Sequence, residues 1–381
     1  MARTSPVAEA TGEVRCLDCR PVPDLISFAR GAPAPEALNG DLIARCAAQA
    51  LADDPTVILS YGTGGGYPPL RHWLAQHHGT TADRVLVSNG SLEAYVFLLE
   101  TFLQPGELVA LEAPTYDRAL LQAELHGMDI LPIPMQDDGM DVEVLAAACD
   151  AGRVPKLVYT IPNFHNPAGT TLSAEKRVAL IALAERYGFM ILEDDPYGRL
   201  RFEGDHIPGI YETGGPEHVM FSSSFSKTVA PGLRVGYLIA HPDLVATLTA
   251  QANRTYISPS HLPEAAIHRL CADGHLPGNI AKVTDLMRVR RDAMLGGLAH
   301  MPEGTTCTPP HGGFFMWLEL PEGLSADALL PEAQEAGVTY VPGAACFTSG
   351  GENTLRLAYS GVSPEQITTG MERLGAVLRA G

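Results

Sequence analysis

Basic residues are scarce in this chain of 381 residues. It has 26 lysines and arginines against 44 aspartates and glutamates, which gives a net charge of −18 and a pI of about 5.1. Nucleic-acid binding depends on clustered cations that neutralise phosphates, so this balance argues against a nucleic-acid partner. The negative charge favours solubility and carries no information about the fold.

Long apolar runs are also absent. A helix that crosses a bilayer needs about 18 or more consecutive apolar residues, and the sequence contains no such run. The first 15 residues, MARTSPVAEATGEVR, lack the apolar core of a secretory signal. These absences predict no membrane partner and a cytoplasmic location.

Cysteine is sparse and dispersed, with seven residues in the whole chain. An odd, scattered set in a protein of this length is typical of reduced thiols in a cytosol rather than of a disulfide framework. Cys16 and Cys19 form a C-x-x-C pair. A structural zinc site normally needs a second ligand pair nearby, and the sequence offers none, so we predict no metal site.

Short apolar runs that end in turn residues alternate with helical patterns through the middle of the chain. The expected strands lie in the segments 84–91, 107–116, 156–164, 189–197, 218–227 and 234–242. The expected helices between them cover 91–103, 117–127 and 173–188. This alternation predicts an α/β fold, a three-layer sandwich around a mostly parallel sheet. In such sheets ligands bind beyond the carboxyl ends of the strands.

The pattern changes after about residue 260 and predicts a smaller α+β domain. A long helix is expected over 276–300, and its Arg288, Arg290 and Arg291 are interpreted as a solvated helix face. Further expected elements are strands in 312–320, 338–343 and 354–360 and a final helix over 363–380. We predict an N-terminal arm with part of the small domain in 1–45, a large domain in 46–275 and the rest of the small domain in 276–381.

One lysine stands in an unusual context, in the segment SSSFSKTVAPGLRVGY (222–237). Lys227 follows Ser224 and Ser226, and Arg234 comes seven residues later. A lysine amine in a suitable environment can form a Schiff base with an aldehyde. Hydroxyl donors and a guanidinium are what a phosphate monoester needs. The segment therefore indicates covalent binding of a phosphorylated aldehyde cofactor.

Two further strand ends carry polar groups. SNGS ends one expected strand and opens a helix, so Gly90 and Ser91 could offer backbone amides to a phosphate, or could simply cap the helix. EDDPY ends another, and because neighbouring strand residues face opposite sides, only one of Asp194 and Asp195 can face a ligand. A carboxylate beneath a pyridine ring would keep its nitrogen protonated, although an acidic loop in water is the alternative.

Three more residues fit the same interpretation, each with a structural alternative. Asn166 opens a tight Asn-Pro loop and could donate to a phenolate oxygen, and Tyr116 could stack on a flat cofactor or belong to the core. Arg356 lies inside an apolar strand and needs an anionic partner, which is either a structural carboxylate or the carboxylate of a substrate.

In this order along the chain, these residues resemble the motifs of fold-type I aminotransferases that depend on pyridoxal phosphate. The resemblance extends from ISFARGAPAPE (26–36) to TLRLAYS (354–360) and is strongest to the branch of 2-aminoadipate and kynurenine aminotransferases. It implies pyridoxal 5′-phosphate as cofactor, and an L-amino acid and a 2-oxo acid such as 2-oxoglutarate as substrates. It also implies a homodimer with shared active sites.

The resemblance implies a role for each matched residue. Lys227 would form the Schiff base and shuttle the proton of a ping-pong reaction, while Asp194 would pair with the ring nitrogen. Tyr197 and Asn166 would bind the phenolic oxygen of the ring. The remaining implied contacts are stacking by Tyr116, carboxylate binding by Arg356, and phosphate binding by Gly90, Ser91, Ser224, Ser226, Arg234 and Tyr61 of the partner subunit.

The chain departs from that pattern at several positions. Leu92 and His165 stand where glutamine is usual, so Leu92 removes one side-chain donor next to the phosphate. Arg30 stands where a small residue is usual, beside Gly31, which is expected to pass close to the substrate. Arg30 is interpreted as a possible contact to the variable side chain of the substrate, with a surface salt bridge as the alternative.

Three functions are compatible with the sequence. An aminotransferase is the leading prediction. A lyase or decarboxylase would use the same cofactor and break a different bond. A ligand-sensing domain without catalysis is the third, but the matched pattern begins near residue 26 and the negative charge opposes contact with DNA.

Overall fold

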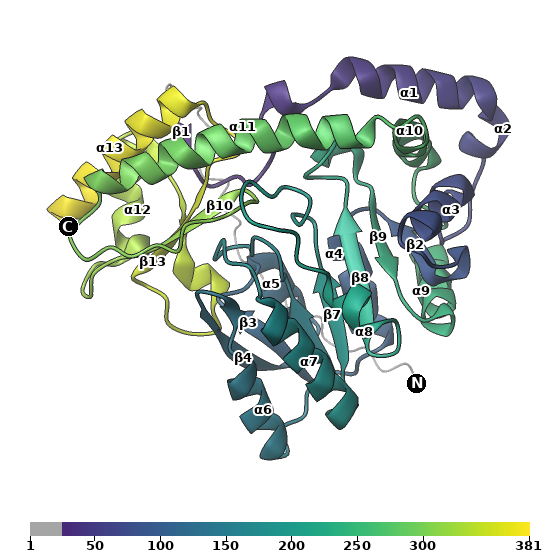
Figure 1. Ribbon diagram of the computed structural model, residues 1–381, viewed down its shortest axis with the longest axis horizontal. Helices are drawn as coiled ribbons and strands as arrows, with labels where there is room; N and C mark the ends of the chain where they lie inside the picture. Colours follow the sequence, from purple (N-terminus) through teal and green to yellow (C-terminus); the bar gives the residue numbers. More distant parts are fainter. Residues whose placement is uncertain (1–24) are drawn as a thin grey trace, which may run out of the picture.

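The computed structural model describes residues 25–381. An eight-stranded sheet forms its centre, with helices packed around it (Figure 1). The strand order is β2-β9-β8-β7-β6-β3-β4-β5. The strands are β2 (Val85–Ser88), β3 (Leu108–Ala113), β4 (Asp129–Gln136), β5 (Gly139–Met140), β6 (Leu157–Thr160), β7 (Met190–Asp194), β8 (Val219–Ser224) and β9 (Gly236–Ile239). Neighbours from β4 to β8 are parallel, whereas β5, β9 and β2 pair antiparallel with their neighbours. The mostly parallel sheet is confirmed, and each of the six expected strands is present.

Helices cover both faces of this sheet, so the three-layer sandwich is confirmed. One face packs against α4 (Ser91–Thr101), α5 (Asp117–Leu125) and α9 (Pro242–Tyr256). The other face packs against α3 (Pro68–His77) and α10 (His261–Ala272) over β2 and β9. Farther along that face lie α6 (Val142–Asp150), α7 (Ala174–Tyr187) and α8 (Ile210–Gly214).

Local sequence signals set several boundaries. The hydroxyl of Ser173 accepts a hydrogen bond from the backbone amide of Lys176 at the start of α7. Gly188 ends that helix with φ of 76°, a left-handed conformation that glycine adopts without steric cost. The sequence did not indicate β4, because Pro132 and Pro134 within it are unusual in a strand.

A second, smaller module follows the sheet. The 21-residue helix α11 (Leu276–Gly296) runs from the neighbourhood of α10 toward α13 (Pro364–Ala380) (Figure 1). A three-stranded antiparallel sheet has the order β10-β13-β12, with β10 (Phe315–Glu319), β13 (Thr354–Ala358) and β12 (Val341–Pro342). Near the chain's start, β1 (Ile26–Ser27) pairs in parallel with β11 (Val338–Thr339). This pairing brings residues 26–31 to the C-terminal module.

The remaining elements of the described chain are three further α-helices and five 3-10 helices. They are α1 (Gly40–Asp53), α2 (Pro55–Ile58), α12 (Ala326–Glu335), η1 (Pro35–Ala37), η2 (Ala82–Arg84), η3 (Pro231–Leu233), η4 (Gly297–His300) and η5 (Gly343–Cys346). None of the helices in residues 25–381 is long and apolar enough to cross a bilayer. The proposed division of the chain at residues 45 and 275 stays a prediction, and Cys16 and Cys19 lie outside the described residues.

The interpretation of the arginines on α11 is wrong for two of the three. Arg290 and Arg291 are 2% and 3% exposed, and only Arg288 lies largely in solvent. Nη1 of Arg290 donates to the carbonyl of Ser360 at 2.6 Å, and Nη1 of Arg291 donates to the carbonyl of Pro310 at 2.7 Å. Both guanidinium groups also pair with glutamates from other segments, Glu36 and Glu203. These contacts hold α11 against the rest of the protein. The charge pattern alone had suggested that this face of the helix is exposed to solvent.

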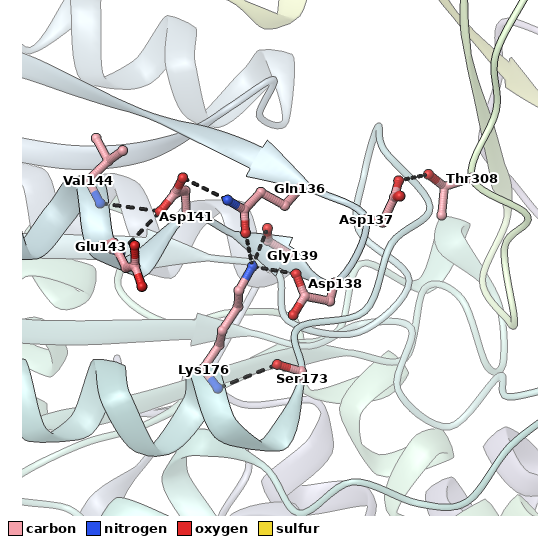
Figure 2. Close-up of polar contacts among 10 residues, drawn as sticks. All are labelled: Gln136, Asp137, Asp138, Gly139, Asp141, Glu143, Val144, Ser173, Lys176 and Thr308. Carbon is pink, nitrogen blue, oxygen red and sulfur yellow. Dashed lines mark hydrogen bonds and ion pairs between the residues drawn. The ribbon is translucent and has the colours of Figure 1, made fainter.

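A polar cluster ties the turn between β4 and β5 to both parts of the structure (Figure 2). The amine of Lys176 on α7 donates to Oε1 of Gln136 at 2.6 Å and pairs with Asp138. The neighbouring Asp137 accepts a hydrogen bond from the hydroxyl of Thr308 at 2.6 Å. The turn thus connects α7 with the segment that leads into β10.

Candidate active site

The carboxyl ends of the central strands converge on one cavity of about 360 Å³. Each of the central strands β3, β6, β7 and β8 is followed by residues that line it, and the N-terminus of α4 and the segment 29–31 complete the wall. The predicted site residues that line it are Arg30, Gly31, Gly90, Ser91, Leu92, Tyr116, Asn166, Asp194, Tyr197, Ser224, Ser226, Lys227, Arg234 and Arg356. Tyr61 does not line it and is 87% exposed.

Lys227 reaches into this cavity from the turn after β8. Its amine donates to the carbonyl oxygen of Gly31 at 2.6 Å and lies 5.7 Å from the ring centres of Tyr197 and Phe314. Burial, followed by the positive charges of Arg356 and Arg234, lowers the pKa of Lys227 to about 8. A larger fraction of the amine is therefore uncharged at neutral pH than for an ordinary lysine, which makes it a better nucleophile.

Asp194 lies at the end of β7 with one carboxylate oxygen held and the other unpartnered. Oδ2 accepts a hydrogen bond from the hydroxyl of Tyr159 at 2.8 Å, and Oδ1 is buried without a partner among residues 25–381. Burial raises the pKa of Asp194 to about 7. The side chain of Asp195 accepts instead from the amide of Gly198 at 2.7 Å and does not line this cavity. The two carboxylates face different environments, as the strand geometry predicted.

Hydroxyl groups and a guanidinium gather at one end of the cavity. The hydroxyl of Ser224 donates to Ser226 at 2.8 Å and accepts from the amide of Ser226 at 3.1 Å. Nη2 of Arg234 donates to the carbonyl of Asn89 at 2.9 Å. A side chain at Gly90 would come within 2.2 Å of that guanidinium, so glycine is needed for this approach. Together with the first amides of α4, these groups form a site suited to a phosphate.

Arg356 also lines the cavity. It is 8% exposed on β13, and Nη1 donates to Oδ1 of Asn166 at 2.9 Å while Nη2 donates to the carbonyl of Ala29 at 2.8 Å. No carboxylate pairs with it among residues 25–381, and its Nε is buried without a partner. Because Asn166 uses its oxygen on Arg356, its amide nitrogen remains as a donor for a ligand.

A buried pair that the sequence did not reveal supports the loop that carries Asn166. Nε2 of His165 lies 2.9 Å from Glu112, and both side chains are 1% exposed. Nδ1 of His165 accepts from the amide of Ala168 at 3.1 Å. Glu112 also accepts from the hydroxyl of Thr160 at 2.6 Å and the amide of Ile161 at 3.0 Å.

Sequence reasoning also missed several lining residues, namely Ala29, Asp117, Arg118, Ile161, Pro196, Pro231 and Phe315. Tyr159 was missed as the partner of Asp194, and the register that places it opposite Leu192 on the adjacent β7 is known only from the structure. The signal in the sequence was its hydroxyl inside an apolar strand.

The residues present fit pyridoxal 5′-phosphate. The unpartnered buried oxygen of Asp194 suits the protonated ring nitrogen, and the group around Ser224, Ser226 and Arg234 suits the phosphate. Lys227 lies in the same cavity, where its amine can reach an aldehyde. A fold of this type with such a cavity defines a fold-type I enzyme that depends on pyridoxal phosphate.

Comparison with known proteins narrows this class. Residues 23–374 match the family of class I and II aminotransferases. The chain is 34% identical to aromatic-amino-acid aminotransferase 1 of Thermococcus litoralis over 93% of this chain and 88% of the relative. It is 36% identical to the 2-aminoadipate transaminase of Thermus thermophilus over 94% of this chain and 91% of that relative. The solved α-aminoadipate aminotransferase of Thermus thermophilus, complexed with N-(5′-phosphopyridoxyl)-L-leucine, superimposes with a TM-score of 0.89 at 35% identity, covering 94% of this chain and 93% of that one.

The protein belongs to the class I and II aminotransferases. It is an enzyme that uses pyridoxal phosphate to transfer amino groups between amino acids and 2-oxo acids. The predicted family, fold class, cofactor and reaction type are confirmed.

Proposed function

We propose that this enzyme moves the amino group of an L-amino acid to 2-oxoglutarate by a ping-pong mechanism in which Lys227 is the essential amine. The amino donor leaves as its 2-oxo acid, and 2-oxoglutarate leaves as glutamate, so the two half-reactions balance. The observation that carries the proposal is the buried amine of Lys227 in one cavity with Asp194 and with Arg356, which lacks a carboxylate partner.

The proposed roles are those that the resemblance implies, and the contacts within the cavity support them. Arg356 binds the α-carboxylate of the substrate, because its guanidinium is buried and has only neutral oxygen partners. Tyr116 would pack against the ring of the cofactor, and Asn166 and Tyr197 would donate to its phenolic oxygen. Pyridoxal phosphate, when bound, supplies the electron withdrawal that acidifies the Cα–H bond of the substrate.

Lys227 is proposed to move the proton from Cα. A general base works best when its pKa lies near the operating pH, and the pKa of about 8 for Lys227 meets this requirement. Asp194 is proposed to keep the ring nitrogen of the cofactor protonated. Gly90, Ser91, Leu92, Ser224, Ser226 and Arg234 are proposed to surround the phosphate.

A homodimer is proposed to complete the site. Tyr61 is 87% exposed, and the apolar side chains of Leu59 and Ile257 are exposed as well. The amide of Gly62 donates to the hydroxyl of Ser258 at 3.2 Å, so the segments that carry Tyr61 and Ile257 lie side by side. We call these three side chains the apolar patch. An apolar surface of this kind fits a second copy of the chain, whose cavity would receive Tyr61 at the phosphate. Because the five cysteines in the described part of the chain are free thiols, we place the dimer in the cytoplasm.

The proposal is tested with the cofactor-loaded protein. Reduction with borohydride followed by peptide mapping should find the phosphopyridoxyl group on Lys227. A panel of L-amino acids should then shift the absorbance of the cofactor, and 2-oxoglutarate should restore it with formation of glutamate. Release of ammonia in place of glutamate would instead favour a lyase, and an unmodified Lys227 would contradict the assignment.

A further inference from the structure

One cation at the cavity has no role in the function proposed above. Arg30 lines the cavity and is exposed, and within residues 25–381 its side chain makes no hydrogen bond or ion pair. Its positive charge contributes to the low pKa of Lys227, so its guanidinium acts within the electrostatic reach of the reacting amine. An arginine held at such a place and left without an anion is suited to bind one from the substrate.

The backbone on both sides of Arg30 is fixed by two residues of the site. The carbonyl of Ala29 accepts from Arg356 at 2.8 Å, and the carbonyl of Gly31 accepts from Lys227 at 2.6 Å. A side chain at Gly31 would come within 2.3 Å of the ring of Phe315, so this segment packs closely against β10. Arg30 is therefore placed between the group proposed to bind the α-carboxylate and the group proposed to attack the cofactor.

The charges that line the cavity leave Arg30 as the cation without a partner. The lining contains Arg30, Arg118, Lys227, Arg234 and Arg356 as cations, and its acids are two, Asp117 and Asp194. Arg118 is paired with Asp117 at 3.6 Å. Under the proposed function the phosphate occupies Arg234, the α-carboxylate occupies Arg356, and Lys227 bonds to the cofactor. Under these assignments Arg30 is the cation of the described lining to which no direct anionic partner is assigned.

We propose that Arg30 binds a carboxylate at the distal end of the substrate, which makes dicarboxylic amino acids and dicarboxylic 2-oxo acids the preferred substrates. This inference rests on the proposed function and deepens it. A guanidinium can bind a carboxylate through two parallel hydrogen bonds. Because both substrates of a ping-pong reaction occupy the same cavity in turn, Arg30 would serve the amino donor and the 2-oxo acceptor alike.

Ligand binding to the holoenzyme tests this assignment without turnover. The probes are glutarate, which has two carboxylates, and butyrate, which has one, measured by calorimetry. We expect glutarate to bind the unaltered enzyme at least about tenfold more tightly, the ratio that a charge-assisted hydrogen bond supplies. Arg30→Gln should reduce the ratio of the glutarate affinity to the butyrate affinity to near one. Arg30→Lys should give an intermediate ratio, because lysine keeps the positive charge but lacks the paired N–H donors of the guanidinium.

Arg118→Gln is the matched control. It removes another cation that lines the same cavity, but one that already pairs with Asp117. It should retain the preference for glutarate. If Arg30→Gln retains it as well, or if the unaltered enzyme does not distinguish the two probes, Arg30 has no role in binding a distal carboxylate and the inference is overturned.

Single-turnover measurements separate this inference from the proposed function. Glutamate and its uncharged analogue glutamine are mixed with the holoenzyme, and the absorbance of the cofactor is followed. Arg30→Gln should slow the half-reaction with glutamate by about tenfold and leave glutamine within about twofold. An equal loss with both amino acids would contradict the role of Arg30, whereas an unaltered enzyme that reacts with no amino acid would contradict the proposed function.

Discussion

At the scale of single residues, the environment of Lys227 determines when its amine can react. The unaltered pKa of a lysine is about 10.4, and burial with two neighbouring arginines lowers it to about 8 in this cavity. Since the lowered pKa disfavours the charged form, the neutral amine is the minor form below pH 8 and the major form above it. The reactivity of the site therefore depends on pH in the range where enzymes normally work.

We predict that the apoprotein takes up pyridoxal phosphate faster as the pH rises. The rate should increase about tenfold per pH unit below pH 8 and level off above about 9, because the neutral fraction of Lys227 follows this course. The measurement is the absorbance change after mixing at pH 6 to 10. A rate that still rises steeply at pH 10 would mean that Lys227 has an ordinary pKa.

A second residue-scale prediction concerns Tyr159, whose hydroxyl holds Asp194. Tyr159→Phe removes a hydrogen bond to a buried carboxylate, so Asp194 should hold its proton more readily and bind the ring nitrogen less well. We expect the affinity for the cofactor to fall about tenfold, as measured by spectral titration. Tyr95→Phe is the control, because the hydroxyl of Tyr95 has no partner in the described chain and its ring lies 5.0 Å from that of Tyr159.

At the scale of elements, the loop after β6 depends on the pair of Glu112 and His165. The ring of His165 lies against Glu112, near the end of β3, and accepts from the amide of Ala168. The loop from His165 to Ala168 carries Asn166. His165→Leu should remove the polar group that lies 2.9 Å from the buried carboxylate and leave the amide of Ala168 without its acceptor. We expect this to cost about 2–3 kcal/mol of unfolding free energy. The loosened loop should also raise KM for every amino donor about tenfold.

His165→Gln is the matched variant for this prediction. An amide side chain can donate to Glu112 and accept from Ala168, and glutamine is usual at this position in the enzymes that the sequence resembles. The unfolding free energy of His165→Gln in urea and its KM for amino donors should both be close to those of the unaltered enzyme. If His165→Leu behaves in the same way, the pair does not position Asn166.

The helix α11 gives a second prediction at this scale. Arg290→Met removes the donor to the buried carbonyl of Ser360, and we expect a loss of about 2–3 kcal/mol in urea unfolding. Arg288→Met changes an arginine on the same helix that is 45% exposed and pairs only with Asp285 in the described chain. It should alter stability by less than about 0.5 kcal/mol. Equal effects would show that burial of Arg290 does not matter.

At the scale of the whole molecule, the apolar patch around Tyr61 predicts a dimer that is needed for activity. Leu59→Arg places a charge where a second copy is proposed to bind, so this variant should sediment as a monomer at concentrations where the unaltered enzyme is a dimer. It should also lose affinity for the cofactor, since Tyr61 of the partner would no longer reach the phosphate. Leu125→Arg, which changes an equally exposed leucine on α5, should do neither.

Much of the molecule follows from local patterns in the sequence. The expected strands and helices of the sandwich are present because strands buried on both faces are continuous apolar runs that end in polar turns. Most of the predicted cavity residues meet for the same reason, since the carboxyl ends of parallel strands share one edge of the sheet. The prolines of β4 show the limit of such patterns, because they hide a strand that its pairing with β3 and β5 stabilises.

The sequence by itself determined most strands of the sheet and the polar residues at their ends, because each of these depends on neighbours in the chain. Only the tertiary structure decided which charges are buried and what they contact. Arg290, Glu112 and Tyr159 all contact partners on other elements, and the separations along the chain range from 35 residues for Tyr159 to 254 for Arg290. Periodicity is a local property, whereas burial of a charge depends on every segment that packs around it.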